Sequence, residues 1–393
     1  KISSNELDLP QMTIAPNPEI TNSTKDKFIQ MLEKSSRPVV VAGSGAWYSG
    51  SKDSLREFVE ELDLPIFTLN FGRGIISDDH KNCLGQASPS ASNAFKKITS
   101  EADLIILLGV RLSLYIGWGR TFNPKAKIIQ MDIENEEIGR NIPADLPILS
   151  DIDKALIKIN DNIRDSGINF TNWMDTCREW KEDQWKEIIK LKDSNEKPLH
   201  VLRVVKSIEE VFDENTMLCI DGGDTQAWTD SVYQNTKPGM YVKGGPLGCM
   251  GVGVPFALGS KVAFPERQVA LISGDGAIGM NLMEFETAVR HKIPFVCIVC
   301  NDQSWGMTKH QHWLTYGKEN TPPGHELPFI GYHEIVKAMG GYGELVTEAD
   351  DLSPAIERGI KSGLPALINV VTNPDATSAA THAITAMMMP KEK

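Results

Sequence analysis

Two aspartates that lie 27 positions apart, Asp275 and Asp302, carry the clearest chemical signal in this sequence. Each follows a short apolar run, residues 268–272 and 294–300, which predicts a strand before each aspartate. A right-handed strand-helix-strand unit brings both carboxylates to the carboxyl edge of one parallel sheet. Carboxylate oxygens suit Mg2+, and the glycines on both sides of Asp275 let backbone N–H groups approach an anion. The pair therefore predicts a site for a diphosphate with its metal.

This pattern resembles the diphosphate signature of thiamine diphosphate (ThDP) enzymes, a Gly-Asp-Gly followed at this spacing by an Asn-Asn pair. The resemblance extends along nearly the whole chain, to the acetolactate synthase, oxalyl-CoA decarboxylase and 2-hydroxyacyl-CoA lyase branch. It implies that Mg2+ is held by the carboxylates of Asp275 and Asp302 and by the backbone carbonyl of Ser304. Asp302 stands where the family has Asn, which keeps an oxygen ligand and adds a negative charge. The alternative, a common glycine turn and an unrelated Asn-Asp turn, is disfavoured by the spacing. Further cofactor contacts implied in these loops are Gly274, Gly276, Ala277, Trp305, Gly306 and Met307.

A glycine-rich segment, residues 244–251, adds to the resemblance. Met250 stands 25 residues before Asp275, at the position where the family places a bulky apolar side chain between the two rings of ThDP. The same resemblance implies that the carbonyl of Gly248 accepts a hydrogen bond from the cofactor's amine. The alternative for Met250 is an ordinary core methionine.

A third segment follows the apolar run at residues 217–220 and resembles the strand-end loop that touches the diphosphate in these enzymes. Its implied contacts are Gly223, Asp224 and Thr225. Relatives more often have neutral groups here, and Asp224 is repelled by a phosphate unless it reaches water or a cation. We therefore rank Asp224 below Thr225. A helix N-cap at either residue is compatible with this role.

Alternating predicted strands and helices indicate an α/β fold with two doubly wound parallel-sheet domains. With 393 residues, of which 41% are hydrophobic, the chain can form two substantial cores. We expect the tail to be either a disordered end or a lid over the site. The expected divisions are a lead (1–24), a middle domain (25–165), a helical linker (166–197), a domain that binds the diphosphate and Mg2+ (198–372) and a tail (373–393).

Composition narrows the class of protein. The net charge of -12 argues against a general nucleic-acid partner, and no apolar run approaches the length of a membrane span. The six cysteines have no paired metal-site spacing. We therefore expect reduced thiols in a cytoplasmic protein.

Two residues of the first half match positions where relatives hold the ADP part of FAD, free ADP or CoA. Arg111 is the candidate for a phosphate and Asp132 for a ribose. A surface ion pair and a strand-end turn are equally compatible with them. Gly43 and Gly45 also hint at a nucleotide phosphate, although such a glycine pair is more often a tight turn.

The segment after the metal loop should face the substrate. Trp305 and Met307 would shape an apolar pocket, and His310 or Gln311 would transfer protons or polarise a carbonyl. The alternative is that His310 is an ordinary surface residue. The run that begins at Arg111 is nearer to the CoA-using lyases than to acetolactate synthases, which favours a 2-hydroxyacyl-CoA lyase that works through a thiazolium ylide.

The resemblance also implies a partner. Relatives have three domains, and this sequence begins where the middle domain would begin. The pyrimidine-binding domain normally supplies a glutamate that activates the cofactor, so we expect a smaller polypeptide to supply it in a hetero-oligomer. Lys1 is not an initiator Met, and a trimmed chain is the alternative. An acetolactate synthase-like transferase, a 2-oxo acid decarboxylase and a noncatalytic subunit that binds ThDP or a nucleotide remain open as functions.

Overall fold

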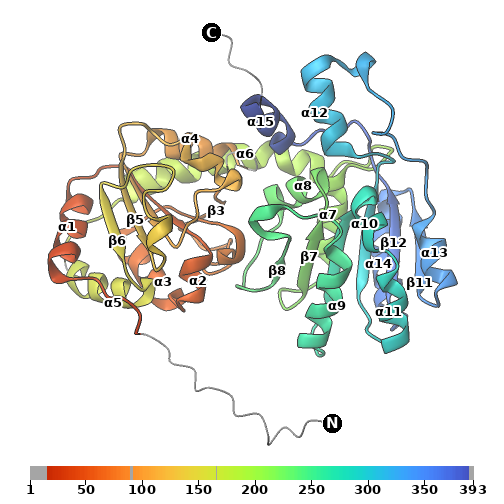
Figure 1. Ribbon diagram of the computed structural model, residues 1–393, viewed down its shortest axis with the longest axis horizontal. Helices are drawn as coiled ribbons and strands as arrows, with labels where there is room; N and C mark the ends of the chain where they lie inside the picture. The colour runs from red at the N-terminus through yellow and green to blue at the C-terminus, as the bar shows by residue number, and fades with distance from the viewer. Residues whose placement is uncertain (1–15, 89–91, 165, 389–393) are drawn as a thin grey trace, which may run out of the picture.

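Two six-stranded parallel sheets organise the computed structural model, which describes residues 16–88, 92–164 and 166–388 (Figure 1). The first sheet has the order β3-β2-β1-β4-β5-β6 and the second β11-β12-β10-β9-β7-β8. The α/β fold class predicted from the sequence, two doubly wound parallel-sheet domains, is confirmed. Among the described residues, no helix is long and apolar enough to cross a membrane.

The first domain alternates strands with helices that cover both faces of the sheet. Its strands are β1 (Pro38–Ala42), β2 (Ile66–Thr68), β3 (Cys83–Gln86), β4 (Leu104–Leu108), β5 (Lys127–Asp132) and β6 (Leu146–Leu149). Its helices are α1 (Asn22–Glu33), α2 (Ser44–Tyr48), α3 (Lys52–Leu62), α4 (Asn93–Glu101) and α5 (Ile152–Ile163), with short 3-10 turns η2 (Asn70–Gly72), η3 (Leu114–Gly119) and η4 (Asn135–Glu137).

The second domain repeats this arrangement, and the long helix α6 (Thr171–Lys192) precedes it. Its strands are β7 (Met217–Asp221), β8 (Tyr241–Val242), β9 (Val269–Gly274), β10 (Val296–Asn301), β11 (Tyr342–Val346) and β12 (Ala366–Val371). Its helices are α7 (Val201–Val211), α8 (Asp224–Val232), α9 (Gly253–Ala263), α10 (Asp275–Asn281), α11 (Glu284–His291), α12 (Gly306–Tyr316), α13 (Tyr332–Ala338), α14 (Ala349–Lys361) and α15 (Ala379–Met388), with 3-10 turns η5 (Gly245–Leu247) and η6 (Lys318–Asn320).

Strand burial explains why these runs become central strands. All residues of β1, β4 and β10 are buried, because helices cover both faces of each sheet. Each sheet therefore separates two apolar clusters, one on each face. Such continuous apolar runs are the sequence signal from which parallel strands are predicted.

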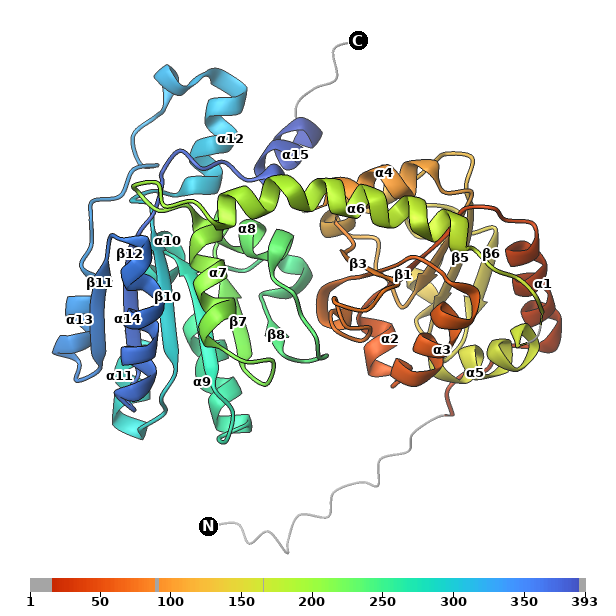
Figure 2. The same ribbon diagram turned by 180° about the vertical axis from the view of Figure 1, so that it is seen from behind.

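Helix α6 joins the two domains along one side of the molecule (Figure 2). Trp173 lies in the core of the first domain, and its Nε1 donates a hydrogen bond to the carbonyl of Pro38 (2.9 Å). Near the other end of the helix, Trp185 packs against the core of the second domain. The tryptophans of this helix thus serve packing between elements.

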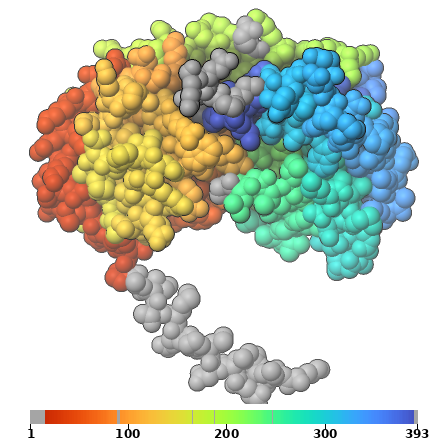
Figure 3. Space-filling view, turned by 45° about the horizontal axis from the view of Figure 1, so that its top comes forward, coloured from red at the N-terminus to blue at the C-terminus, as the bar shows by residue number. Residues whose placement is uncertain are grey.

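The C-terminal segment folds back over the second domain. Residues 379–388 form α15, so this part of the tail is an ordered helix and not a disordered end. It packs on α8 and α12, and Figure 3 shows it (dark blue) between α12 (light blue) and the first domain (orange).

A buried polar network fixes the two domains against each other. Arg73 of the first domain forms an ion pair with Asp78 (Nη2 to Oδ2, 2.6 Å) and donates to the carbonyl of Tyr233 in the second domain (2.8 Å). The backbone N–H of Asn235 donates to the same Asp78 oxygen (2.7 Å). Arg73 and Asp78 are 3% and 4% exposed, so water does not replace either partner if the other is lost.

We expect Arg73→Met to lower the free energy of unfolding by about 3–5 kcal/mol, because it leaves Asp78 buried without its cation. Urea titration followed by tryptophan fluorescence measures this loss. The matched control is Arg290→Met, which breaks an exposed pair with Glu286 and should cost about 0.5 kcal/mol or less. Equal losses in the two variants would show that the domain interface does not depend on the buried pair.

Candidate functional site

Three loops meet at one edge of the second sheet. Strand β9 lies between β7 and β10, with Asp221 paired to Ser273 and Gly274 paired to Cys300. Because the strands are parallel, the loops at residues 222–225, 274–277 and 302–306 all leave the carboxyl edge. The adjacency predicted for Asp275 and Asp302 therefore follows directly from the sheet order.

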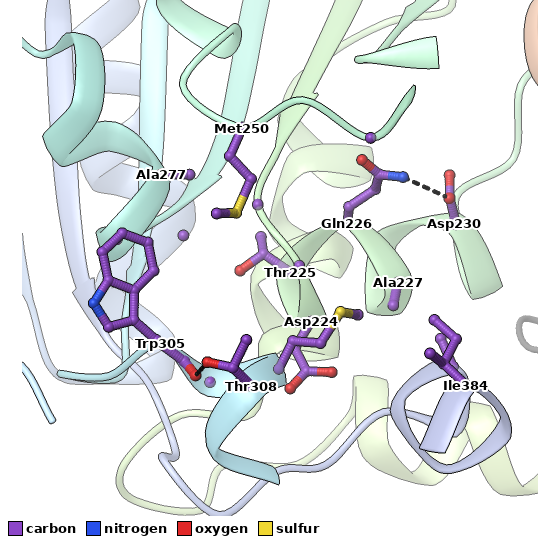
Figure 4. Close-up of a pocket in the computed structure, with 18 of the residues that line it drawn as sticks. Asp224, Thr225, Gln226, Ala227, Asp230, Met250, Ala277, Trp305, Thr308 and Ile384 are labelled. Atoms are coloured by element: carbon purple, nitrogen blue, oxygen red, sulfur yellow. Dashed lines mark hydrogen bonds between the residues drawn. The ribbon is translucent and has the colours of Figure 1, made fainter. Parts of the chain in front are cut away.

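These loops line a cavity of about 410 Å³ (Figure 4). Of the residues singled out in the sequence, those that line the cavity are Gly223, Asp224, Thr225, Gly248, Met250, Gly274, Asp275, Gly276, Ala277, Asp302, Ser304, Trp305, Gly306 and Met307. Those that are not among its lining residues are Arg111, Asp132, His310 and Gln311.

Asp275 and Asp302 form the charged end of the cavity. Burial and, next, the nearby carboxylate of Asp302 raise the pKa of Asp275 to about 7. The pKa of Asp302 is also raised, mainly by burial. Asp275 Oδ2 is buried and accepts no hydrogen bond from any described residue. A carboxylate oxygen left in this state, facing a second carboxylate, fits a divalent cation.

The two carboxylates are the acidic part of this candidate metal site. Among the described residues, no group of three or more His, Cys, Asp or Glu side chains is arranged so that it could hold a metal ion. Further ligands would therefore be backbone or phosphate oxygens, which suits Mg2+. Ser304, whose backbone N–H donates to Asp302 Oδ1 (3.1 Å), lies beside the pair.

Lys309 offsets part of this negative charge. It is 4% exposed, lies on α12 and holds its ammonium 5.0 Å from the ring centre of Trp313. Its positive charge lowers the pKa of Asp302 against the larger effect of burial. The extra charge that Asp302 brings in place of Asn thus has a nearby cation within the same chain.

Two glycines let the loops pack closely around the cavity. A Cβ atom at Gly276 would lie 2.7 Å from the ring of Trp305, and one at Gly223 would lie 2.8 Å from Cβ of Met307. Any larger residue would push the aromatic or thioether side chain out of place. The glycines therefore bring the loops of β7 and β9 against the loop of β10.

The segment with Met250 is held by a buried carboxylate. Asp221, at the end of β7, accepts hydrogen bonds from the backbone N–H groups of Gly222 (2.8 Å), Gly251 (3.2 Å) and Gly253 (2.8 Å). Met250 precedes these anchored glycines and lines the cavity with 41% of its surface exposed. An exposed methionine on an anchored loop is not a core residue. This arrangement fits a side chain that supports a ligand.

His310 lies outside the cavity lining. It is 1% exposed; Nδ1 bonds to Asp224 Oδ2 (2.7 Å) and Nε2 to the carbonyl of Pro374 (2.9 Å). Both ring nitrogens are therefore engaged within the protein. Gln311, the next residue of α12, also lies outside the cavity lining. Of the three catalytic candidates, the structure brings only Trp305 to the cavity.

The nucleotide candidates of the first domain are engaged within the protein. Arg111 Nε lies 2.9 Å from Glu137 Oε1, and Asp132 Oδ1 accepts from the backbone N–H of Glu134 (3.0 Å). A Cβ atom at Gly43 would lie 2.3 Å from the carbonyl oxygen of Gly109. Gly43 thus allows two backbone turns to pack closely, and this packing accounts for a glycine at this position without a bound phosphate.

Several cavity residues were missed in the sequence. Tyr115 reaches the cavity from the first domain, and Ile384 from α15. Gln226 and Asp230 lie four residues apart on α8, directly after Thr225, and this helical spacing could have indicated them. Tyr115 and Ile384 carry no comparable signal, because their approach depends on how domains and tail pack. The missed lining residues are Ser88, Leu114, Tyr115, Gly222, Gln226, Ala227, Asp230, Leu247, Thr308, Ala380 and Ile384.

Comparison with known proteins matches both domains. The model of the central domain of thiamine pyrophosphate enzymes matches residues 26–159, and that of their C-terminal TPP-binding domain matches residues 221–370. The acetolactate synthase large subunit IlvG of Mycobacterium tuberculosis is 30% identical over 93% of this chain and 64% of its own length. Oxalyl-CoA decarboxylase of Escherichia coli is 28% identical over 96% of this chain and 65% of its own. 2-hydroxyacyl-CoA lyase 1 of Mus musculus is 28% identical over 89% of this chain and 62% of its own length. The chain thus spans less than two thirds of these relatives.

We expect Asp275→Asn to stabilise the metal-free chain by about 2 kcal/mol near pH 8, because it removes a buried charge that faces Asp302. The folded-state pKa of Asp275, about 7, is above its ordinary value of 3.8, so the wild type loses stability as the pH rises through this range. The difference between the two proteins should therefore vanish near pH 4. Urea unfolding in EDTA between about pH 4 and pH 8 measures it.

Mg2+ should reverse this order, because only the wild type retains both carboxylates for the cation. Asp26→Asn, at an exposed position on α1, is the control and should change stability little at any pH. If Asp275→Asn destabilises the metal-free chain at pH 8, the buried charge of Asp275 does not cost the folded chain stability, and the prediction is wrong.

Proposed function

Because this chain belongs to the thiamine pyrophosphate enzymes, we propose that its cavity binds thiamine diphosphate with Mg2+ and that the protein cleaves or forms carbon-carbon bonds. The main support is the pair Asp275 and Asp302, with a buried carboxylate oxygen that no described residue satisfies. The cavity also has an apolar part, formed by Met250, Trp305 and Met307, where rings can pack.

Each group of the site has a role in this proposal. Asp275, Asp302 and the carbonyl of Ser304 would hold the cation, while backbone N–H groups of Gly223 and Thr225 would bind phosphate oxygens. Met250 would support the bent cofactor, and the Gly248 carbonyl would accept from its amine. When bound, the cofactor supplies a nucleophilic carbon and accepts the electrons of the bond that breaks. The side chains of this chain bind, orient and exclude water.

The lining favours a substrate without a free carboxylate at the reacting end. Among the described residues that line the cavity there is no Lys or Arg, and the only charged groups are aspartates. A 2-oxo acid would need a cation to receive its carboxylate, whereas a thioester carbonyl is neutral. We therefore propose a lyase that acts on a 2-hydroxyacyl-CoA or a related acyl thioester.

An acetolactate synthase-like reaction is the second candidate. Its support is the 30% identity to an acetolactate synthase large subunit along 93% of this chain. That reaction joins 2-oxo acids, so it would require a carboxylate-binding cation other than the residues that line the cavity.

We further propose that a pyrimidine-binding partner completes the site. No glutamate is among the described residues that line the cavity, so the activating carboxylate would come from elsewhere. An exposed apolar side chain, Leu247 (88% exposed), lines the cavity together with Met250. Met280 lies against Gly251 and is exposed as well. A patch of this kind marks a protein interface.

The first domain would then have a binding role or a structural one. Arg111 already pairs with Glu137, so a nucleotide such as ADP, CoA or FAD would have to displace that contact.

Five cysteines are buried free thiols, which suits a reducing compartment such as the cytoplasm. They are Cys83, Cys177, Cys219, Cys297 and Cys300.

The assay that tests this function supplies the chain with ThDP, Mg2+ and a polypeptide that carries the pyrimidine-binding domain. We expect a 2-hydroxyacyl-CoA to be cleaved next to its thioester carbonyl with release of an aldehyde, which an aldehyde dehydrogenase-coupled reaction records. The Asp275→Asn complex, in which a neutral amide replaces an anionic metal ligand, should be at least about 100-fold slower. Consumption of pyruvate with an inert thioester would establish the second candidate, and failure to bind ThDP would overturn the proposal as a whole.

We expect Leu247→Ser to weaken association with that polypeptide about tenfold, because a largely exposed leucine loses the apolar area that it would bury. Sedimentation velocity measures the affinity. The matched control is Leu364→Ser, which also changes an exposed leucine but lies before β12, at the opposite edge of the sheet. If both substitutions have the same effect, the patch near the cavity is not the docking surface.

A further inference from the structure

Helix α15 forms a wall of the cavity. Ala380 and Ile384 line it together with Ala227 of α8. Figure 4 shows Ile384 far from Met250 and Trp305, across the cavity from the side where the cofactor rings would lie. The side chains that α15 presents to the cavity are apolar.

The carboxylate of Asp224 holds this wall in place. Oδ1 accepts hydrogen bonds from Ser378 Oγ (2.5 Å) and Thr381 Oγ1 (2.6 Å), and Oδ2 accepts from His310 Nδ1 (2.7 Å). His310 Nε2 in turn lies 2.9 Å from the carbonyl oxygen of Pro374, just before the helix. Asp224, His310, Ser378 and Thr381 are all at least nine-tenths buried, and hydrogen bonds to a buried carboxylate are strong.

The two anchoring residues come from the loops that would hold the diphosphate and the cation. Asp224 is the first residue of α8, between Gly223 and Thr225. His310 lies on α12, which starts at Gly306 directly after the loop that contains Asp302. The loops meet at Gly306, where a Cβ atom would lie 2.7 Å from Asp302 Oδ2 and 3.6 Å from Asp224 Oδ2.

We propose that Asp224 and His310 are positioning residues that couple occupancy of the diphosphate and cation site to the placement of α15, which sets the size of the apolar substituent that the substrate can carry. Asp224 then has no direct part in phosphate binding. Its carboxylate points to the C-terminal segment, which also removes the conflict of a negative charge beside a phosphate. The part of the inference that concerns the substrate rests on the proposed function, and the anchoring part does not.

Hydrogen exchange of the full chain tests the anchor, read on peptides from residues 376–388 by mass spectrometry. Thr381→Val removes a donor to Asp224, and the control Thr385→Val removes a buried hydroxyl of the same helix that donates only to its own turn (Thr381 O, 2.7 Å). We expect exchange in Thr381→Val to be about tenfold faster than in Thr385→Val. Equal rates would overturn the anchor.

Pyrophosphate with Mg2+ tests the coupling, because this probe fills the diphosphate site without reaching α15. We expect bound probe to slow exchange of residues 376–388 several-fold in the wild type and to have no such effect in Asp224→Asn, although calorimetry shows the probe bound to both. Slowing that persists in Asp224→Asn, or none in the wild type, overturns the coupling. If the probe binds neither protein, the proposed function fails, while the comparison of Thr381→Val with Thr385→Val still decides the anchor.

Ile384→Ala tests the substrate part in the assembled complex. We expect kcat/KM for a substrate with a longer apolar chain to rise about tenfold relative to a short one, mostly through KM, because the wall recedes. Met388→Ala, one turn further along α15 and 76% exposed, is the control and should leave the ratio unchanged. An unchanged ratio in Ile384→Ala would show that α15 does not limit the substrate.

Discussion

Two carboxylates buried side by side are the constraint on which the rest of the site depends. Asp275 and Asp302 are placed together because β9 and β10 are neighbours in a parallel sheet, and burial then makes their charges costly. The groups around them are those that reduce this cost: backbone N–H groups of the two loops, the ammonium of Lys309 and, in our proposal, Mg2+.

Close packing determines where the apolar part of the site can be. Gly276 and Gly223 allow Trp305 and Met307 to pack directly against neighbouring loops. These two side chains therefore form a closely packed part of the cavity lining. The first domain completes the cavity with Tyr115, and the buried pair of Arg73 and Asp78 keeps that domain in register with the second. Stability of the interface and shape of the cavity are therefore linked.

Polar residues near the site have two different uses, and their hydrogen-bond partners distinguish them. Asp275 has an oxygen without a partner among the described residues, which indicates a ligand. Asp224 has both oxygens occupied by His310, Ser378 and Thr381, which indicates an anchor. The two aspartates begin the helices that follow two neighbouring strands, β7 and β9, yet their surroundings assign them different roles.

The sequence by itself determined the sheet class and the three loops at its carboxyl edge, because apolar strand runs and glycine turns are local patterns that parallel sheets require. It also indicated Met250 and the aspartate pair, since their spacing is a property of the chain. Only the tertiary structure decided that His310 supports α15, that Tyr115 and Ile384 enter the cavity and that Arg111 pairs with Glu137. Those contacts join segments far apart in the chain, and side-chain burial and hydrogen-bond partners across such distances are set by packing.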